Sequence, residues 1–507
     1  SDYTGGDDFS LYYGIDAETI SVNLLSFRES AAEDGFFMLL VQPPLTVPED
    51  EVIPKDVIVV LDQSGSMSGD KWAQAQAATT YVLANLKSND RFNVVAFSTG
   101  VRTYSLNMEP IAQVGDAVKW IEGLFPEGST DINAALLTAL EQTDPERETA
   151  VLFLTDGLAT EGVIETADIL DNLAEANRPN ARIFTFGVGD DVDTFLLDQI
   201  VEDFNGTGSY VRPTERIDEE VASLYNKISA PVLTDVTLDF AGARVELLYP
   251  ETINDLFAGE QITLVGRYRD GSDNLTLTLS GMVNREELVY IYNGLTLRSR
   301  AGGESFIPRL WATRRIGDLL NTIRLRGENQ EVIDSIISLS VRYGIITPYT
   351  SFLIEEDDIL SQQGRERAAQ GFAEDAEALS EAFTGTGAVT AADEIGGLRD
   401  AAAPQAAPMP TGTAPGGTGG STDDTDGMMP AGNAITTVND KIFVVQDGAW
   451  IDTAFEPDTM STEKVAFLSD AYFDLLTQYP ALGDYFALGE WVIVVYEGVA
   501  YEVVPEA

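Results

Sequence analysis

The spacing of hydrophobic residues along this chain changes after residue 229, and the change separates two kinds of structure. Between about residues 54 and 229, short continuous apolar runs such as 57–61 and 150–155 alternate with helical patterns such as 71–86. Apolar runs of this length are typical of strands that are buried on both faces, and such strands occur in parallel sheets flanked by helices. The pattern predicts one doubly wound α/β domain over residues 51–229.

Alternating apolar and polar residues follow this region, which is typical of antiparallel strands with one buried face. Five segments show the alternation, at 232–240, 244–248, 261–268, 275–280 and 287–292. Three more strand-like segments precede the α/β region, at 9–13, 20–27 and 36–41. Three short strands are too few to be stable alone. We therefore expect the α/β domain to be inserted into an antiparallel β-sandwich built from residues 1–50 and 230–300.

The remainder of the chain has three compositions. Residues 301–361 have a helical pattern and include several arginines. Residues 362–433 are rich in Ala, Gly, Thr and Pro, and beyond a short Ala/Glu-rich helix at 365–382 they are expected to form a flexible linker. Residues 434–507 regain strand-like and helical segments and predict a small α+β C-terminal domain.

Oxygen-bearing side chains follow the buried strand at 57–61. Asp62, Ser64 and Ser66 occupy alternate positions, so their oxygens can face one point beyond the carboxyl end of the strand. Hard cations such as Mg²⁺ take oxygen ligands. A strand-to-helix turn capped by Asp and Ser has the same pattern, so this segment alone does not distinguish the two interpretations.

Two later loops favour the metal site. Thr130 lies in a loop before a helical pattern, and Asp156 directly follows the buried strand at 150–155. The three loops together offer two carboxylates and three hydroxyls, a set suited to Mg²⁺, with Ca²⁺ or Mn²⁺ as alternatives. Neutral hydroxyls leave such a cation able to accept an outside carboxylate, which favours an acidic group on a protein partner.

The order and spacing of these loops resemble the von Willebrand factor type A (vWA) domain and its metal-ion-dependent adhesion site (MIDAS). The resemblance assigns that site to Asp62, Ser64, Ser66, Thr130 and Asp156, and none of these positions departs from the family pattern.

Segments outside the α/β domain are similar to the inter-alpha-trypsin inhibitor heavy chains and their bacterial relatives. The similar segments are 34–37, 308–317 and 339–352, and the likeness extends over about residues 9–357. Members of that family carry a β-rich domain, the VIT domain, ahead of the vWA domain. This chain begins after the place where that domain would end, so we expect it to be lacking here.

Composition excludes several kinds of chemistry. The 507 residues include no His and no Cys, which excludes Ser-His-Asp and Cys-His catalysis and the usual zinc sites. The formal net charge of −53, with 83 acidic and 30 basic residues, argues against nucleic acid and anionic membranes as partners. No apolar segment is long enough to span a bilayer. We expect a protein that is not an enzyme.

These observations lead to two functional hypotheses. The first is a secreted or cell-surface adhesion protein that uses its divalent cation to capture an acidic group of a partner. The second is a structural subunit that self-associates through an exposed strand edge. Metal-independent, concentration-dependent assembly would favour the second hypothesis.

Overall fold

The computed structural model divides the chain into two compact units. It describes residues 19–46, 53–345, 347, 359–403 and 435–505, apart from residues 179, 254, 285 and 440. The first unit comprises Ser1–Ser26, Phe37–Ser299 and Phe383–Thr390, and the second comprises Phe27–Phe36, Arg300–Ala382 and Ala391–Ala507. The strand expected at 9–13 lies outside the described residues. No helix of the described part is long and apolar enough to cross a membrane.

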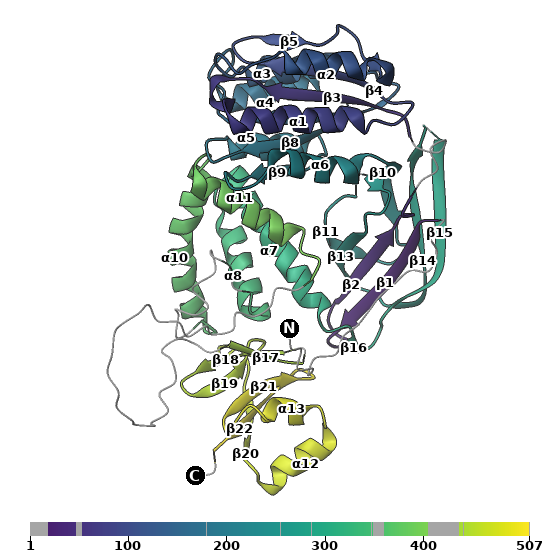
Figure 1. Cartoon of the computed structure of the whole chain (residues 1–507). Helices are drawn as coiled ribbons and strands as arrows, with labels where there is room; N and C mark the ends of the chain where they lie inside the picture. The colour runs from purple at the N-terminus through teal and green to yellow at the C-terminus, as the bar shows by residue number, and fades with distance from the viewer. Residues whose placement is uncertain are drawn as a thin grey trace, which may run out of the picture. The chain divides into compact units, whose positions relative to one another are not determined.

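A seven-stranded sheet forms the middle layer of the α/β domain, which is part of the first unit (Figure 1). Its strands run in the order β5-β4-β3-β7-β8-β9, and β6 pairs with β4. The neighbours β4, β3, β7, β8 and β9 are parallel, which confirms the predicted doubly wound α/β domain. The strands are β3 (Lys55–Asp62), β4 (Arg91–Phe97), β5 (Val101–Thr103), β6 (Glu109–Pro110), β7 (Glu148–Thr155), β8 (Ala181–Val188) and β9 (Gly208–Val211).

Helices cover both faces of this sheet, because alternate residues of each central strand point to opposite faces. On β3, Val57 and Val59 belong to the core beneath α1 and α6, whereas Ile58 and Val60 belong to the core beneath α3, α4 and α5. The helices are α1 (Asp70–Ala84), α2 (Val114–Glu122), α3 (Ile132–Glu141), α4 (Thr166–Ala176), α5 (Thr194–Asp203) and α6 (Ile217–Ile228). Two 3-10 turns, η1 (Gly65–Met67) and η2 (Ile111–Gln113), lie in the connections.

Two further sheets share an apolar core of their own, whose residues belong to the first unit. One has the order β11-β13-β2-β1-β16 and the other the order β12-β10-β14-β15. Phe37 and Leu264 from the first sheet and Leu233 and Leu277 from the second belong to this shared core. The strands are β1 (Ser21–Arg28), β2 (Gly35–Gln42), β10 (Pro231–Asp239), β11 (Val245–Tyr249), β12 (Asp255–Phe257), β13 (Ile262–Tyr268), β14 (Ser272–Val283), β15 (Glu286–Leu297) and β16 (Gly302–Gly303).

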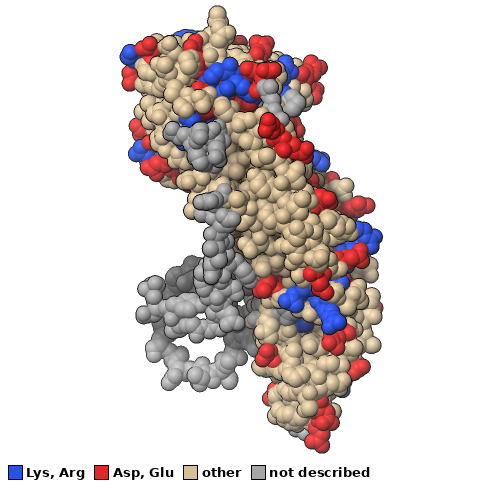
Figure 2. Space-filling view, turned by 90° about the vertical axis from the view of Figure 1, so that its right-hand side faces the viewer, with Lys and Arg blue, Asp and Glu red and all other residues tan. Residues whose placement is uncertain are grey.

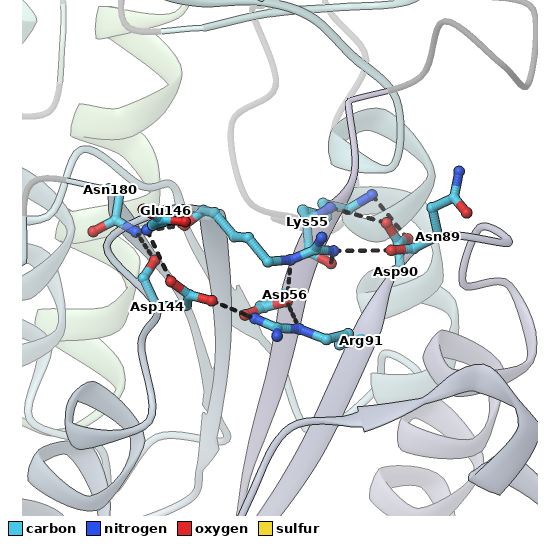
Figure 3. A network of polar contacts seen from close by, with 9 residues as sticks. Lys55, Asp56, Asn89, Asp90, Arg91, Asp144, Glu146 and Asn180 are labelled. Carbon is cyan, nitrogen blue, oxygen red and sulfur yellow. Dashed lines mark hydrogen bonds and ion pairs between the residues drawn. The ribbon is translucent and has the colours of Figure 1, made fainter. Parts of the chain in front are cut away.

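The amino ends of β3, β4 and β7 are joined by a buried charge network (Figure 3). Asp56 has no exposed surface and accepts two bonds from Arg91, at 2.9 and 2.6 Å, and one from Arg147, at 2.8 Å. Burying a carboxylate is costly unless cations and hydrogen bonds compensate it. Two arginines from different segments supply that compensation, so the network fixes where β3 starts relative to its neighbours.

Lys55 connects the beginning of the α/β domain to its end. Its ammonium pairs with Asp90 at 3.3 Å and donates to the Ser229 carbonyl oxygen at 2.6 Å. Ser229 is the C-cap residue of α6, the last helix of the domain. The two crossings between the α/β domain and the flanking sheets are therefore held together by one buried side chain.

The helix predicted at 365–382 corresponds to α10 (Gln362–Glu381). Helix α11 (Thr386–Arg399) occupies residues that were expected to be flexible, so the linker prediction is wrong there. Alanine is the strongest helix former, and Ala376 and Ala388 are buried. Residues 404–433 of the expected linker lie outside the described part.

Residues Phe383–Thr390, between and within these helices, belong to the first unit. The Phe383 carbonyl accepts the backbone N–H and the hydroxyl of Thr194, at 2.9 and 3.0 Å. The Thr386 hydroxyl donates to Asp190 at 3.0 Å, and Val389 is buried in the core beneath α3, α4 and α5. We refer to Phe383–Thr390 as the strap.

The second unit contains a helical group and a mixed sheet. Helices α7 (Ile307–Arg326) and α8 (Gln330–Tyr343) pack against each other and against α10. The C-terminal sheet has the order β17-β18-β19-β21-β22-β20. Its elements are β17 (Ile435–Val438), β18 (Lys441–Gln446), β19 (Ala449–Asp452), β20 (Thr462–Ala466), α12 (Asp470–Gln478), α13 (Leu482–Phe486), β21 (Val492–Tyr496) and β22 (Val499–Val504).

Glu148 begins β7 beside a group of charges from the flanking sheets. Arg182 lies next to it and pairs with Asp235 at 2.8 Å and Asp255 at 3.3 Å. Burial raises the pKa of Glu148 to about 7; Arg182 opposes the rise, and the two aspartates add to it. The folded protein therefore holds a proton on Glu148 at pH values where the unfolded chain has released it.

Replacing Glu148 by Gln should raise the melting temperature at pH 8 and leave it nearly unchanged at pH 4. A carboxyl whose folded pKa is raised costs stability as the pH rises from its unfolded value through its folded value. Thermal unfolding between pH 4 and pH 8 measures the effect, with exposed Glu122→Gln as the matched control. A melting temperature that differs from the wild-type value by the same amount at every pH would contradict this explanation.

Candidate metal centre

The candidate metal ligands lie at the point where the sheet changes its winding direction. From β3 the chain continues to β4 on one side, and from β7 it continues to β8 on the other side, while β3 and β7 are parallel neighbours. Ligands of open α/β sheets bind beyond the carboxyl ends of the strands at this switch point. Asp62 is the last residue of β3, and Asp156 directly follows β7.

Asp62 is a fully buried carboxylate that is satisfied by neutral groups. One oxygen accepts the Ser64 backbone N–H at 2.7 Å, and the other accepts the Thr155 hydroxyl at 2.7 Å. Burial raises the pKa of Asp62 to about 6; hydrogen bonds from Thr155 and Ser64 oppose the rise, and the charge of Asp156 adds to it. Among the described residues, no lysine or arginine forms an ion pair with Asp62.

The two serines connect Asp62 to Asp156. The Ser64 and Ser66 hydroxyl oxygens are 2.9 Å apart, and Ser66 donates to Asp156 Oδ1 at 2.7 Å. Both serines are positioned by the η1 turn, whose Met67 is completely buried in the core beneath α1. The apolar anchor fixes the turn, so the serine oxygens face the carboxylates.

Thr130 reaches the centre through its loop. Its backbone N–H donates to the Thr160 hydroxyl at 3.0 Å, and the Thr160 N–H donates to the Thr130 carbonyl at 3.0 Å. The Gly65 N–H donates to the Gly128 carbonyl at 3.1 Å, which joins this loop to the serine turn. Gly128 has φ +85°, and a Cβ there would lie 2.5 Å from the Thr99 hydroxyl, so glycine is required.

The structure thus places four of the five expected residues in one chain of hydrogen bonds and brings Thr130 to it on a bonded loop. The Thr130 side chain is buried, at 4% exposure, and in the described part of the chain its hydroxyl makes no hydrogen bond to the other four residues. A divalent cation among these groups would meet two carboxylates and three hydroxyls, which are ligands that Mg²⁺ and Ca²⁺ accept.

Lys71 is a residue of this centre that sequence reasoning missed. Its ammonium donates to Asp156 Oδ2 at 2.6 Å from the first turn of α1. The only available signal was a lysine close to the serine motif in a chain with seven lysines.

The oxygen ligands suit a hard cation, but carboxylates alone do not make up the site. In the described part of the chain, no group of three or more Asp, Glu, His or Cys residues is arranged to hold a metal ion. The hydroxyl oxygens must therefore complete any site here. Fully buried Asp62, which lacks a cationic partner among the described residues, is the group that a metal ion would compensate.

The α/β domain of this chain matches a known protein family. The family model of the von Willebrand factor type A domain matches residues 56–217. A solved structure, a von Willebrand factor type A protein from Catenulispora acidiphila, aligns with 73% of this chain and 99% of its own at 14% identity and a TM-score of 0.48.

Two curated relatives are inter-alpha-trypsin inhibitor heavy chains from Homo sapiens. Heavy chain H4 is 28% identical over 362 residues, which cover 67% of this chain and 38% of the relative. Heavy chain H2 is 26% identical over 373 residues, which cover 68% of this chain and 39% of the relative. The chain thus spans about two fifths of the length of these relatives. Residues 56–217 therefore match the von Willebrand factor type A domain, and the chain is similar to the inter-alpha-trypsin inhibitor heavy chains.

Proposed function

We propose that this chain is a protein-binding or adhesion protein whose vWA domain captures an acidic group of a partner through a divalent cation. Asp62, Ser64, Ser66, Thr130 and Asp156 would hold the cation, with Mg²⁺ as the preferred ion. The observation that carries this proposal is the fully buried Asp62 carboxylate, which has neutral hydrogen-bond partners and no cation among the described residues. A charge in that position is stabilised when an ion binds beside it.

The ligand types explain why such a centre would bind an outside carboxylate. Asp62 and Asp156 together balance a divalent charge, whereas the three hydroxyl ligands are neutral. The cation therefore keeps an affinity for further anionic oxygen, and carboxylates form short charge-assisted bonds in such settings. Because no histidine is present, the centre lacks the most common general base for activating a water molecule, which favours binding over catalysis.

We propose a secreted or cell-surface location for this activity. The similarity to the inter-alpha-trypsin inhibitor heavy chains supports it, as does the strongly acidic composition, with 83 Asp and Glu against 30 Lys and Arg. A large negative net charge keeps a protein soluble and repels nucleic acid and anionic membranes. The partner would then be a protein that offers an exposed Asp or Glu side chain or a chain terminus.

Replacing Asp62 by Asn should weaken Mg²⁺ binding at least about tenfold, because one of only two charged ligands is lost. The variant should stay folded and, without metal, should melt at a higher temperature than the metal-free wild type at pH 8. Asn keeps a hydrogen-bonding shape while it removes a buried charge. Titration calorimetry of chelator-treated proteins with Mg²⁺ measures binding, and differential scanning calorimetry measures unfolding.

Asp116→Asn is the matched control, because Asp116 is an exposed aspartate of α2 that pairs with Lys119 away from the centre. It should bind Mg²⁺ as the wild type does. Equal Mg²⁺ and Ca²⁺ binding by the wild type and Asp62→Asn, or binding by neither, would refute the metal-dependent mechanism.

A second candidate function, self-association as a structural subunit, is favoured by one observation. Strand β15 is the last strand of its sheet, and Leu288, Val289 and Ile291 on it are 38%, 53% and 61% exposed. Within the described residues β15 pairs only with β14. Figure 2 turns the side that carries β14 and β15 toward the viewer, and uncharged side chains cover most of the middle of this face. Exposed apolar edge strands favour pairing with another chain.

If β15 mediates self-association, Val289→Lys should abolish concentration-dependent assembly, because a charge at an edge strand opposes pairing. Light scattering coupled to size exclusion, over a range of protein concentrations and with chelator present, measures the assembly. Thr296→Lys adds the same charge to an exposed position of the same strand outside the apolar run. A wild type that remains monomeric throughout would eliminate this candidate.

A further inference from the structure

The two carboxylates of the candidate metal centre are compensated in different ways. Asp156 is 1% exposed, and both of its oxygens are engaged, one by the Ser66 hydroxyl at 2.7 Å and one by the Lys71 ammonium at 2.6 Å. Asp62 accepts bonds only from an amide and a hydroxyl. The chain itself therefore neutralises one of the two charges that a divalent cation would neutralise.

The position of Lys71 on its helix is unfavourable unless it serves a partner. It is the second residue of α1, and the first turn of a helix carries partial positive charge that disfavours lysine. Its partner Asp156 is fully buried and lies 85 residues away in sequence. A surface lysine retained for solubility would extend into water, whereas the Lys71 side chain is only 38% exposed and its ammonium contacts a buried carboxylate.

The loop after β8 restricts the lysine from a second side. A Cβ on Gly189 would lie 3.6 Å from the Lys71 ammonium, so the end of the side chain rests against this backbone. The Gly189 N–H donates to the Val211 carbonyl at 2.8 Å, which holds the loop in place. The ammonium therefore lies between the Gly189 backbone and the Asp156 carboxylate.

Two cations that share one carboxylate repel each other, and partly buried groups are poorly screened from this repulsion. A divalent ion beside Asp156 would lie within a few ångströms of the Lys71 ammonium. Binding would then require either that this repulsion is tolerated or that the ion pair is broken. Both possibilities lower the affinity for the metal ion.

We propose that Lys71 is a resident counter-ion of the centre, which stabilises the metal-free protein by neutralising Asp156 and lowers the affinity for divalent cations. This inference rests on the proposed metal-dependent function and specifies its regulation. A centre with such a lowered affinity is occupied by a metal ion only where the concentration of divalent cations is high. Partner binding would then be confined to surroundings rich in Mg²⁺ or Ca²⁺.

The test compares the full-length wild type with Lys71→Met and Lys71→Arg by Mg²⁺ titration calorimetry after chelator treatment. We expect Lys71→Met to bind Mg²⁺ about tenfold more tightly, because the repelling charge is gone. Lys71→Arg retains the charge and should bind close to the wild-type value. Lys119→Met removes an exposed ammonium from α2 and should change nothing.

Thermal unfolding supplies a second measurement, in which Lys71→Met should lower the stability of the metal-free protein although it raises the affinity for Mg²⁺. Without metal, Lys71→Met should melt at least about 3 °C below the wild type, because it leaves Asp156 buried and unpaired. Saturating Mg²⁺ should reduce or reverse that difference. If Lys71 had a purely structural role, the Lys71→Met variant would instead have both a lower stability and a lower affinity for Mg²⁺.

The outcomes separate this inference from the proposed function. If the wild type binds Mg²⁺ and Lys71→Met binds it equally or more weakly, the counter-ion role is overturned and metal binding stands. If neither the wild type nor Lys71→Met binds Mg²⁺ or Ca²⁺, the metal-dependent function fails, and the counter-ion role fails with it.

Discussion

The ion cluster around Asp56 is the constraint on which the arrangement of the α/β domain depends. A carboxylate without exposed surface must meet cations in one defined geometry. Arg91 provides part of it (Figure 3), and Arg147 provides the rest. These side chains belong to β4 and to the segment before β7, so the starts of three adjacent strands are fixed together. Parallel register persists along a strand, and Leu61 consequently lies opposite Leu154 at the other edge of the sheet. The ion cluster at the amino ends of the strands therefore also sets the alignment of the candidate ligands at their carboxyl ends.

Strand β3 therefore carries a buried aspartate near each end, and the two aspartates differ in whether cations neutralise them. Asp56 is neutralised by two guanidinium groups, one of which binds it through two nitrogens. Asp62 meets only a backbone amide and a threonine hydroxyl. Two equally buried aspartates thus differ: one completes an ion-pair network, and the other keeps a negative charge that no cation of the described residues neutralises. That difference, more than the hydroxyl motif alone, makes the carboxyl end of the strand suited to a cation.

Features that depend on local sequence were predictable, and features that depend on distant partners were not. The apolar runs at 57–61 and 150–155 predicted the buried strands β3 and β7, because burial on both faces leaves no polar positions. The hydroxyl and carboxylate positions followed from being adjacent to those strands. The pairing of Lys71 with Asp156 joins segments that only the folded sheet brings together, so no spacing rule reveals it. Helix α11 was missed because Ala, Gly and Thr are typical of linkers as well as of closely packed helices.

The strap has a consequence for how the protein is made. Val389 contributes to the core beneath α3, α4 and α5, although α6, the last helix of the α/β domain, ends at Ile228. On the ribosome, the sheet and its helices emerge long before the strap does, and so do α7, α8 and α10 of the second unit. The α/β domain can form early, but its core has an unfilled site until the strap has been synthesised. Biogenesis of the first unit is therefore tied to synthesis of the second, and a chain stopped before residue 383 would release an incompletely packed domain.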